Sequence, residues 1–163
     1  MAGTRSSAKP IATTVADASV IVKWFVKERY SEDAERLKND HVDLDARIVV
    51  PSVASYEILN ALKYSNAFGV QELIRISKDL CGFQFIEIPL DEGYGEVAVR
   101  IASEYGLTLY DSSYLAIGQI RSIPVFTADE KVLERVGALR FVHHIRDYSR
   151  DKLEIEEEKK RNK

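Results

Sequence analysis

A chain of 163 residues is long enough to bury a core without covalent or metal staples, and its length is that of one domain. A single cysteine, Cys81, excludes an internal disulfide framework and a zinc module built on several cysteines, and it fits a reducing compartment. The net charge of −3 argues against nucleic-acid binding over the whole surface, but it is compatible with a local basic groove.

The expected elements alternate between strands and helices along the chain. Strands are predicted where short apolar runs end at an acid or a proline, and helices where apolar residues lie between capping residues and glycines. The predicted strands cover 13–17, 47–50, 83–88, 123–126 and 141–145, and the predicted helices cover 19–27, 31–39, 52–66, 70–81, 91–105, 110–121 and 130–136. This alternation predicts an α/β fold whose mostly parallel sheet is covered on both faces.

Two of these helices depend on the choice of a capping residue. The run 19–27 is apolar at most positions, and it fits either a buried helix or a continuation of the first strand. A helix is favoured because Asp17 or Ser19 would cap it well. Ser52 is the expected N-cap of the helix 52–66.

Composition also predicts the domain organisation. Residues 1–12 mix Gly, Ser, Pro and charge, and we expect a flexible leader there, followed by one domain over 13–148. Residues 149–163 are almost all charged, with both signs, and fit either a solvated helix or disorder. The chain has neither a secretory signal nor an apolar run long enough to span a bilayer, so a cytoplasmic location is expected.

Acids follow two of the predicted strands. Asp17 ends the first apolar run, with Ser19 two residues later, and Asp129 follows the strand 123–126. Parallel strands bring the residues that follow them to one edge of the sheet, where α/β domains bind ligands. We therefore expect the two acids to meet, and paired carboxylates suit a hard cation such as Mg²⁺.

Helix capping explains each aspartate when it is taken alone. Asp17 and Asp129 both precede predicted helices. Asp111 follows Thr108 by three residues, which is the spacing of a capping box. No single aspartate therefore requires a functional role.

Glu57 is harder to explain by capping, because it lies in the middle of the predicted helix 52–66. It shares a helix face with Asn60, which suits the wall of a cleft, and a Glu at the border of the buried face explains it equally well. The four acids Asp17, Glu57, Asp111 and Asp129, considered together, favour a cation-binding site. Four acids brought together can hold one or two divalent cations, because the cations offset the repulsion between carboxylates.

Four segments in order resemble a PIN domain, and within that family the small VapC-type toxin ribonucleases. They read VADASV, PSVASYEILNAL, LTLYDSSYLAIGQ and IPVFTADEKVL, and the resemblance covers roughly residues 14 to 145. Each motif is short, but four in the right order and spacing are fairly specific. The resemblance implies a three-layer α/β/α sandwich with a central parallel sheet.

The resemblance also implies roles for individual residues. The acidic quartet of the family matches Asp17, Glu57, Asp111 and Asp129, which would be both catalytic and metal-binding residues. Ser19, Asn60 and Thr127 match the hydroxyl and amide groups beside those acids, and would orient the carboxylates.

The implied activity is cleavage of RNA that depends on Mg²⁺ or Mn²⁺. Asp17, Asp111 and Asp129 would hold the metal, while Glu57 would complete the shell or orient the attacking water. The toxins of the family form homodimers and are neutralised by a small antitoxin, so both partners are expected here. The apolar stretch 20–26 is the expected dimer contact, because it is apolar on more faces than one buried stripe needs.

Basic residues give a weaker signal for nucleic-acid binding. Five of them are candidates for phosphate contacts, with solvated surface charge as the alternative: Lys23, Lys27, Arg29, Lys63 and Arg121.

Three other functions compete with a toxin ribonuclease. A phosphatase of the haloacid dehalogenase type needs an Asp two residues after the first acid, where this chain has Ser19. A non-catalytic PIN module that binds RNA or protein usually lacks part of the quartet, and this chain has all four acids. An RNA-processing PIN nuclease without a toxin role remains an alternative within the family.

Overall fold

The structure is a computed structural model, and it describes residues 11–149, 153, 158–159 and 162. Five strands form one sheet in the order β3-β2-β1-β4-β5, and all four pairings are parallel. The strands are β1 (Ala12–Ala16), β2 (Ala46–Pro51), β3 (Ile86–Ile88), β4 (Val125–Thr127) and β5 (Val142–His144). Most of the predicted leader and tail lies outside the described residues.

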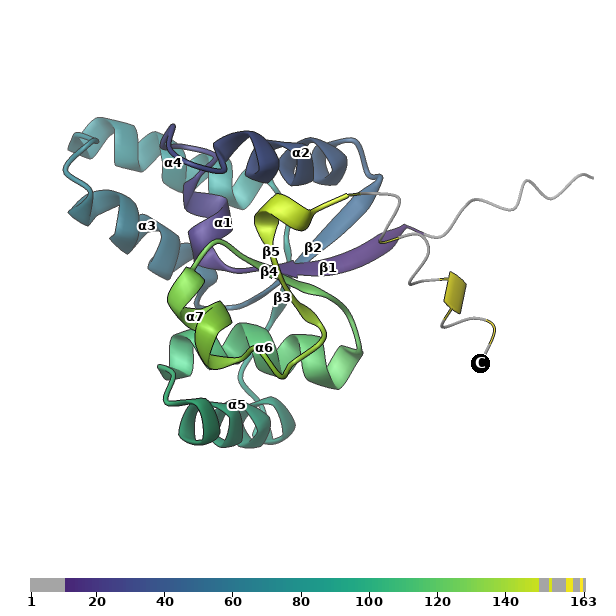
Figure 1. Cartoon of the computed structure of the whole chain (residues 1–163). Helices are drawn as coiled ribbons and strands as arrows, with labels where there is room; N and C mark the ends of the chain where they lie inside the picture. Colours follow the sequence, from purple (N-terminus) through teal and green to yellow (C-terminus); the bar gives the residue numbers. More distant parts are fainter. Residues whose placement is uncertain (1–10, 150–152, 154–157, 160–161, 163) are drawn as a thin grey trace, which may run out of the picture.

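Helices cover both faces of the sheet. They are α1 (Ala18–Val22), α2 (Ser31–Val42), α3 (Ala54–Tyr64), α4 (Val70–Gly82), α5 (Glu92–Tyr105), α6 (Leu109–Arg121) and α7 (Glu130–Arg135), with a short 3₁₀ helix at Ile145–Asp147. Figure 1 shows α1 to α4 on one side of the sheet and α5 and α6 on the other. The predicted three-layer α/β/α fold is thus confirmed. Among the described residues, no helix is long and apolar enough to cross a bilayer.

The centre of the sheet is buried on both faces, as a parallel sheet between two helix layers requires. β1 pairs with β2 on one side and with β4 on the other, with Val15 opposite both Val49 and Val125. These three valines are at most 1% exposed. The end of β1, and with it Asp17, is therefore fixed from both sides.

Helix α6 packs closely on the sheet because it has a glycine where it meets β4. A Cβ atom on Gly118 would overlap the side chain of Val125 and press against the ring of Phe141. This close approach sets the position of α6, whose first turn carries Asp111.

The helix predicted over 19–27 is shorter than expected and ends at Val22. The chain then continues in tight turns, with Trp24 N–H donating to the carbonyl of Ile21. The indole of Trp24 donates to the carbonyl of Ala34 on α2 at 2.9 Å, and its ring packs edge-on against Phe83. Because Trp24 contacts α2, the chain leaves the helical path after Val22.

The same packing accounts for the apolar excess of the stretch 20–26. Val20 and Ile21 are fully buried, and the remaining apolar residues are partly buried against the protein's own core: Val22, Trp24, Phe25 and Val26. The stretch packs within its own domain.

The prediction that Ser52 caps the third helix is wrong. Helix α3 begins at Ala54, and its N-cap is Val53, which makes no side-chain capping bond. Ser52 instead donates its backbone N–H to the carbonyl of Ile88 at 2.9 Å, which extends the pairing between β2 and β3. This bond ties Ser52 to the end of β3, and the helix starts two residues later.

Candidate active site

The four predicted acids line one cleft at the carboxyl edge of the sheet. Its volume is about 280 Å³, and its acidic walls are Asp17, Glu57, Asp111 and Asp129, together with Glu28. Asp17 follows β1 and Asp129 follows β4, while Glu57 and Asp111 come from α3 and α6. Residues from four separate elements converge, as the parallel topology predicts.

Asp17 joins the end of β1 to the start of α1. Its Oδ1 accepts a hydrogen bond from the hydroxyl of Ser19 and another from the N–H of Val20 at 3.2 Å, so it also caps the helix. Burial raises the pKa of this carboxyl to about 6, although the bonds from Ser19, Thr127 and Val20 lower it. The negative charge of Asp111 contributes a further rise.

Asp111 and Asp129 lie at the starts of their helices, where capping was predicted. The hydroxyl of Thr108 donates to Oδ2 of Asp111 at 2.7 Å and accepts the backbone N–H of Asp111 at 3.1 Å. Oδ1 of Asp129 accepts the N–H groups of Lys131 and Val132 at 2.9 and 3.2 Å. Capping and a place in the cleft are therefore compatible, because a helix start can hold a carboxylate at the edge of the sheet.

Glu57 is held by a residue that the sequence pattern did not single out. The hydroxyl of Tyr114 donates to Oε2 of Glu57 at 3.0 Å, and Tyr114 is only 1% exposed. Burial raises the pKa of Glu57 to about 7, and the bond from Tyr114 opposes this rise. Burial also raises the pKa of Tyr114 above its usual value, so the phenol keeps its proton. The spacing of Tyr114 three residues after Asp111 on one helix was the available signal.

Two hydroxyl groups connect the ends of β1 and β4. Oγ of Ser19 lies 3.3 Å from Oγ1 of Thr127 and accepts the N–H of Ala128 at 2.8 Å. Thr127 in turn accepts the N–H of Asp129 at 3.0 Å. This network fixes Asp17 and Asp129 relative to each other.

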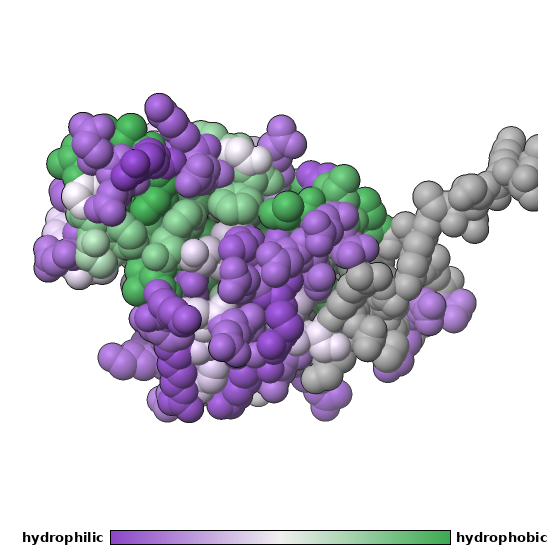
Figure 2. All heavy atoms as spheres, turned by 90° about the horizontal axis from the view of Figure 1, so that it is seen from above, coloured by the Kyte–Doolittle hydropathy of each residue, from purple (hydrophilic) through white to green (hydrophobic). Residues whose placement is uncertain are grey.

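Asn60 is not brought into the cleft. It is exposed and lines a groove between α3 and α4, which also contains Leu59 and Ile74. Three residues turn a helix by about 300°, which points Asn60 about 60° away from Glu57. Figure 2 shows apolar surface on this side of the molecule, between hydrophilic patches.

The donor atoms of the cleft suit a divalent cation, although they do not form a finished metal shell. Carboxylate and hydroxyl oxygens are the ligands that Mg²⁺ prefers, and burial raises the pKa values of Asp17 and Glu57. Among the described residues, no three acidic, histidine or cysteine side chains are arranged to bind a metal ion. One oxygen of each aspartate accepts a hydrogen bond at a helix start, so that oxygen already has a partner within the protein.

Solved structures with a similar fold include one from Klebsiella pneumoniae and one from Pyrobaculum aerophilum. One is a toxin–antitoxin complex from Klebsiella pneumoniae, with a TM-score of 0.61, 15% identity, and coverage of 81% of this chain and 97% of that chain. Another is PAE2754 from Pyrobaculum aerophilum, with a TM-score of 0.58, 20% identity, and coverage of 91% and 96%. At these identities the likeness concerns the fold.

Sequence comparison gives the family. Ribonuclease VapC3 of Pyrobaculum aerophilum is 29% identical over 131 residues, which are 77% of this chain and 95% of the relative. The profile of the PIN domain family matches residues 14–139, and this range contains all four acids of the cleft. The chain therefore belongs to the PIN domain family.

Proposed function

We propose that this protein is a divalent-metal-dependent endoribonuclease that acts as the toxin of a type II toxin–antitoxin pair. The observation that supports this most is the convergence of four carboxylates from four elements in one cleft of a PIN domain. The likeness to Ribonuclease VapC3 supports RNA as the substrate.

In this proposal the aspartates hold the cation and Glu57 handles the water. Asp17, Asp111 and Asp129 would hold Mg²⁺ or Mn²⁺. The chemistry supplied by such an ion would be a lower pKa for bound water and an offset to the charge of the phosphodiester. Glu57 would orient the attacking water, and the hydroxyl of Tyr114 positions one of its oxygens.

The surrounding hydroxyl groups keep the carboxylates in place. Ser19 and Thr127 fix the aspartates at the ends of β1 and β4, and Tyr114 holds one oxygen of Glu57. Such partners commonly change metal affinity or activity about 10- to 100-fold when removed.

The proposed partners are an antitoxin and a second copy of the chain. The Klebsiella pneumoniae neighbour is a toxin–antitoxin complex, which supports an antitoxin as a partner here. A neighbouring reading frame for a short DNA-binding protein, and copurification of its product with this chain, would distinguish a toxin from an RNA-processing nuclease.

The activity itself is tested with purified protein and single-stranded RNA. We expect cleavage with Mg²⁺ or Mn²⁺, none with EDTA, and recovery when metal is added back. Cleavage that continues in EDTA, or a protein that binds RNA but never cuts it with either ion, would contradict the proposal. The second result would favour a non-catalytic binding module.

A further inference from the structure

One positively charged side chain lies inside the acidic cleft. Of the described residues that line the cleft, Lys23 alone is a cation. Its side chain is only 11% exposed, and its Nζ lies 2.7 Å from Oε1 of Glu28, which is 46% exposed. The ammonium group is therefore held at the wall of the cleft by an acid that none of the proposed catalytic roles uses.

The segment that carries Glu28 is held by backbone bonds. Oγ of Ser31 accepts the N–H of Glu28 at 2.8 Å and donates to the carbonyl of Val26 at 3.0 Å. The N–H of Ser31 donates to the carbonyl of Glu28 at 3.1 Å. Lys23 itself closes α1, which follows Asp17 directly. Both partners of the ion pair thus have a defined position relative to the metal ligands.

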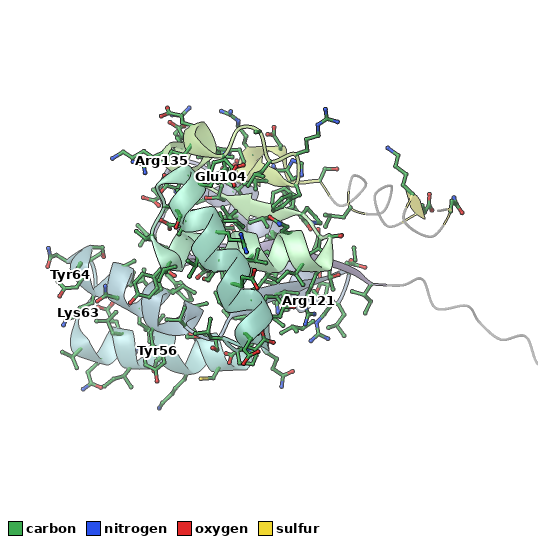
Figure 3. All side chains as sticks on the ribbon, turned by 90° about the horizontal axis from the view of Figure 1, so that it is seen from below. Tyr56, Lys63, Tyr64, Glu104, Arg121 and Arg135 are labelled. Atoms are coloured by element: carbon green, nitrogen blue, oxygen red, sulfur yellow. The ribbon has the colours of Figure 1, made fainter. Side chains whose placement is uncertain are left out.

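The other basic residues considered for phosphate contacts lie elsewhere. Lys27 and Arg29 are exposed, and the guanidinium of Arg29 lies over the ring of Tyr30. Lys63 lines the groove between α3 and α4, and Nε of Arg121 donates to the hydroxyl of Tyr94 at 2.8 Å. Figure 3 shows Lys63 and Arg121 on opposite sides of the molecule.

A polyanion that enters an acidic cleft needs positive charge close to the reacting phosphate. A partly exposed Lys–Glu pair is worth little in water, so a phosphate oxygen can replace Glu28 as the partner of Lys23. We infer that Lys23 binds an RNA phosphate beside the scissile bond, and that Glu28 holds the ammonium group at the cleft wall until RNA arrives. This inference rests on the proposed ribonuclease function.

The test measures RNA affinity in the full chain with Asp17→Asn, a change that we expect to abolish cleavage. Binding of a labelled single-stranded RNA of mixed sequence is followed by fluorescence anisotropy in Mg²⁺ at several salt concentrations. Lys23→Met keeps the apolar stem of the side chain and removes the charge. We expect Lys23→Met to weaken RNA binding about tenfold. The slope of the logarithm of the binding constant against the logarithm of the salt concentration should become less steep by about 1, as expected for the loss of one phosphate contact.

Two variants separate a phosphate contact from a structural ion pair. Lys23→Arg should restore most of the affinity, and Glu28→Gln should tighten binding about threefold because it releases the ammonium group. Lys38→Met is the matched control, because Lys38 is also paired with a Glu, at 3.1 Å, but lies on α2 outside the cleft. We expect its affinity for RNA to stay close to that of the parent chain.

The outcomes also separate this inference from the proposed function. If the parent chain binds RNA and Lys23→Met binds it as tightly as Lys38→Met does, Lys23 is not a phosphate contact. If Glu28→Gln weakens binding as much as Lys23→Met, the pair is structural. If the unsubstituted chain neither binds nor cleaves RNA, the ribonuclease proposal itself fails.

Discussion

The acids of the cleft have two physical roles that oppose each other in part. Asp17 and Asp129 accept backbone N–H groups at the starts of α1 and α7, which positions both carboxylates. The same bonds occupy oxygens that a cation would use. A bound ion would use the second lone pair of such an oxygen or the second oxygen of each carboxylate.

Asp17→Asn should abolish RNA cleavage and change how stability depends on pH. Folding raises the pKa of Asp17 from 3.8 to about 6 and that of Glu57 from 4.5 to about 7. The folded state then binds more protons than the unfolded state between about pH 4 and 7, so the metal-free protein loses stability as the pH rises through this window. Asn keeps the helix cap and removes one of the two titrations.

Thermal unfolding in EDTA at pH 5 and pH 8 measures this effect. For the parent protein in EDTA, we expect an unfolding midpoint about 5 °C lower at pH 8 than at pH 5. This difference between the two pH values should be smaller in Asp17→Asn. It should also be smaller in the parent protein when Mg²⁺ is present. Equal midpoints at the two pH values would contradict the account of buried, uncompensated acids. Full cleavage activity in Asp17→Asn would remove this residue from the site.

Tyr114→Phe removes only the hydroxyl that holds Glu57. We expect kcat to fall about tenfold with little change in KM, because Glu57 loses the group that orients it while the fold keeps the aromatic ring. Steady-state kinetics measures both constants. Tyr64→Phe on α3 is the control, since Tyr64 is 70% exposed, and equal effects of the two changes would argue against a positioning role.

At the scale of elements, local signals in the sequence predicted most of the helices well. Thr108 caps α6 as expected. Asp91, the first residue of the predicted helix 91–105, is the N-cap of α5, and Gly106 ends α5 in the left-handed conformation. The errors arose where tertiary contacts override local preference. Trp24 bonds to α2 and ends α1 early, and sheet pairing at Ser52 delays α3.

The candidate site was predictable to a similar degree. The ends of parallel strands bring Asp17 and Asp129 together, so their convergence follows from sequence order. The contact of Tyr114 with Glu57 joins residues 57 positions apart and depends on how α6 packs against α3, which no local pattern records. Asn60 does not reach the cleft because the three residues from Glu57 to Asn60 fall about 60° short of a full helical turn.

The packing of α6 can be tested at Gly118. Gly118→Ala should lower the free energy of unfolding by about 1–3 kcal/mol, because the added methyl group overlaps Val125. Gly82→Ala is the control, since a Cβ there meets no atom within 4 Å. Urea denaturation measures the free energy of unfolding of both variants. A Gly118→Ala protein as stable as the parent would show that α6 can shift away from β4 without loss of stability.

At the scale of the whole molecule, the strongest candidate for a dimer contact is formed by α5 and α6. A pocket of about 350 Å³ there is lined almost wholly by apolar atoms, and Leu90, Val99, Leu109 and Tyr110 are exposed at 53–80% around it. Protruding side chains beside a pocket suit a twofold interface, because the side chains of each copy can fill the pocket of the other copy. Tyr110 directly precedes Asp111, so this contact would place two acidic clefts close together.

We therefore predict a homodimer at micromolar concentration that Leu90→Arg converts to a monomer. Leu90 is 80% exposed, so the change should leave the fold intact, and burying the new charge in the interface would be costly. Sedimentation velocity measures the association state. Val42→Arg, at another exposed apolar residue, should remain dimeric, and a parent protein that is monomeric throughout would refute the interface.

The central claim is that four carboxylates gather around a divalent cation, and calorimetric titration with Mn²⁺ tests it most directly. The parent chain should bind Mn²⁺ in the cleft, and Asp129→Asn, which keeps a good N-cap for α7, should bind it at least about tenfold more weakly. Mg²⁺ should compete for the same site. Absence of Mn²⁺ binding by the parent chain even with RNA present, or equal affinity in Asp129→Asn, would contradict the metal-dependent site.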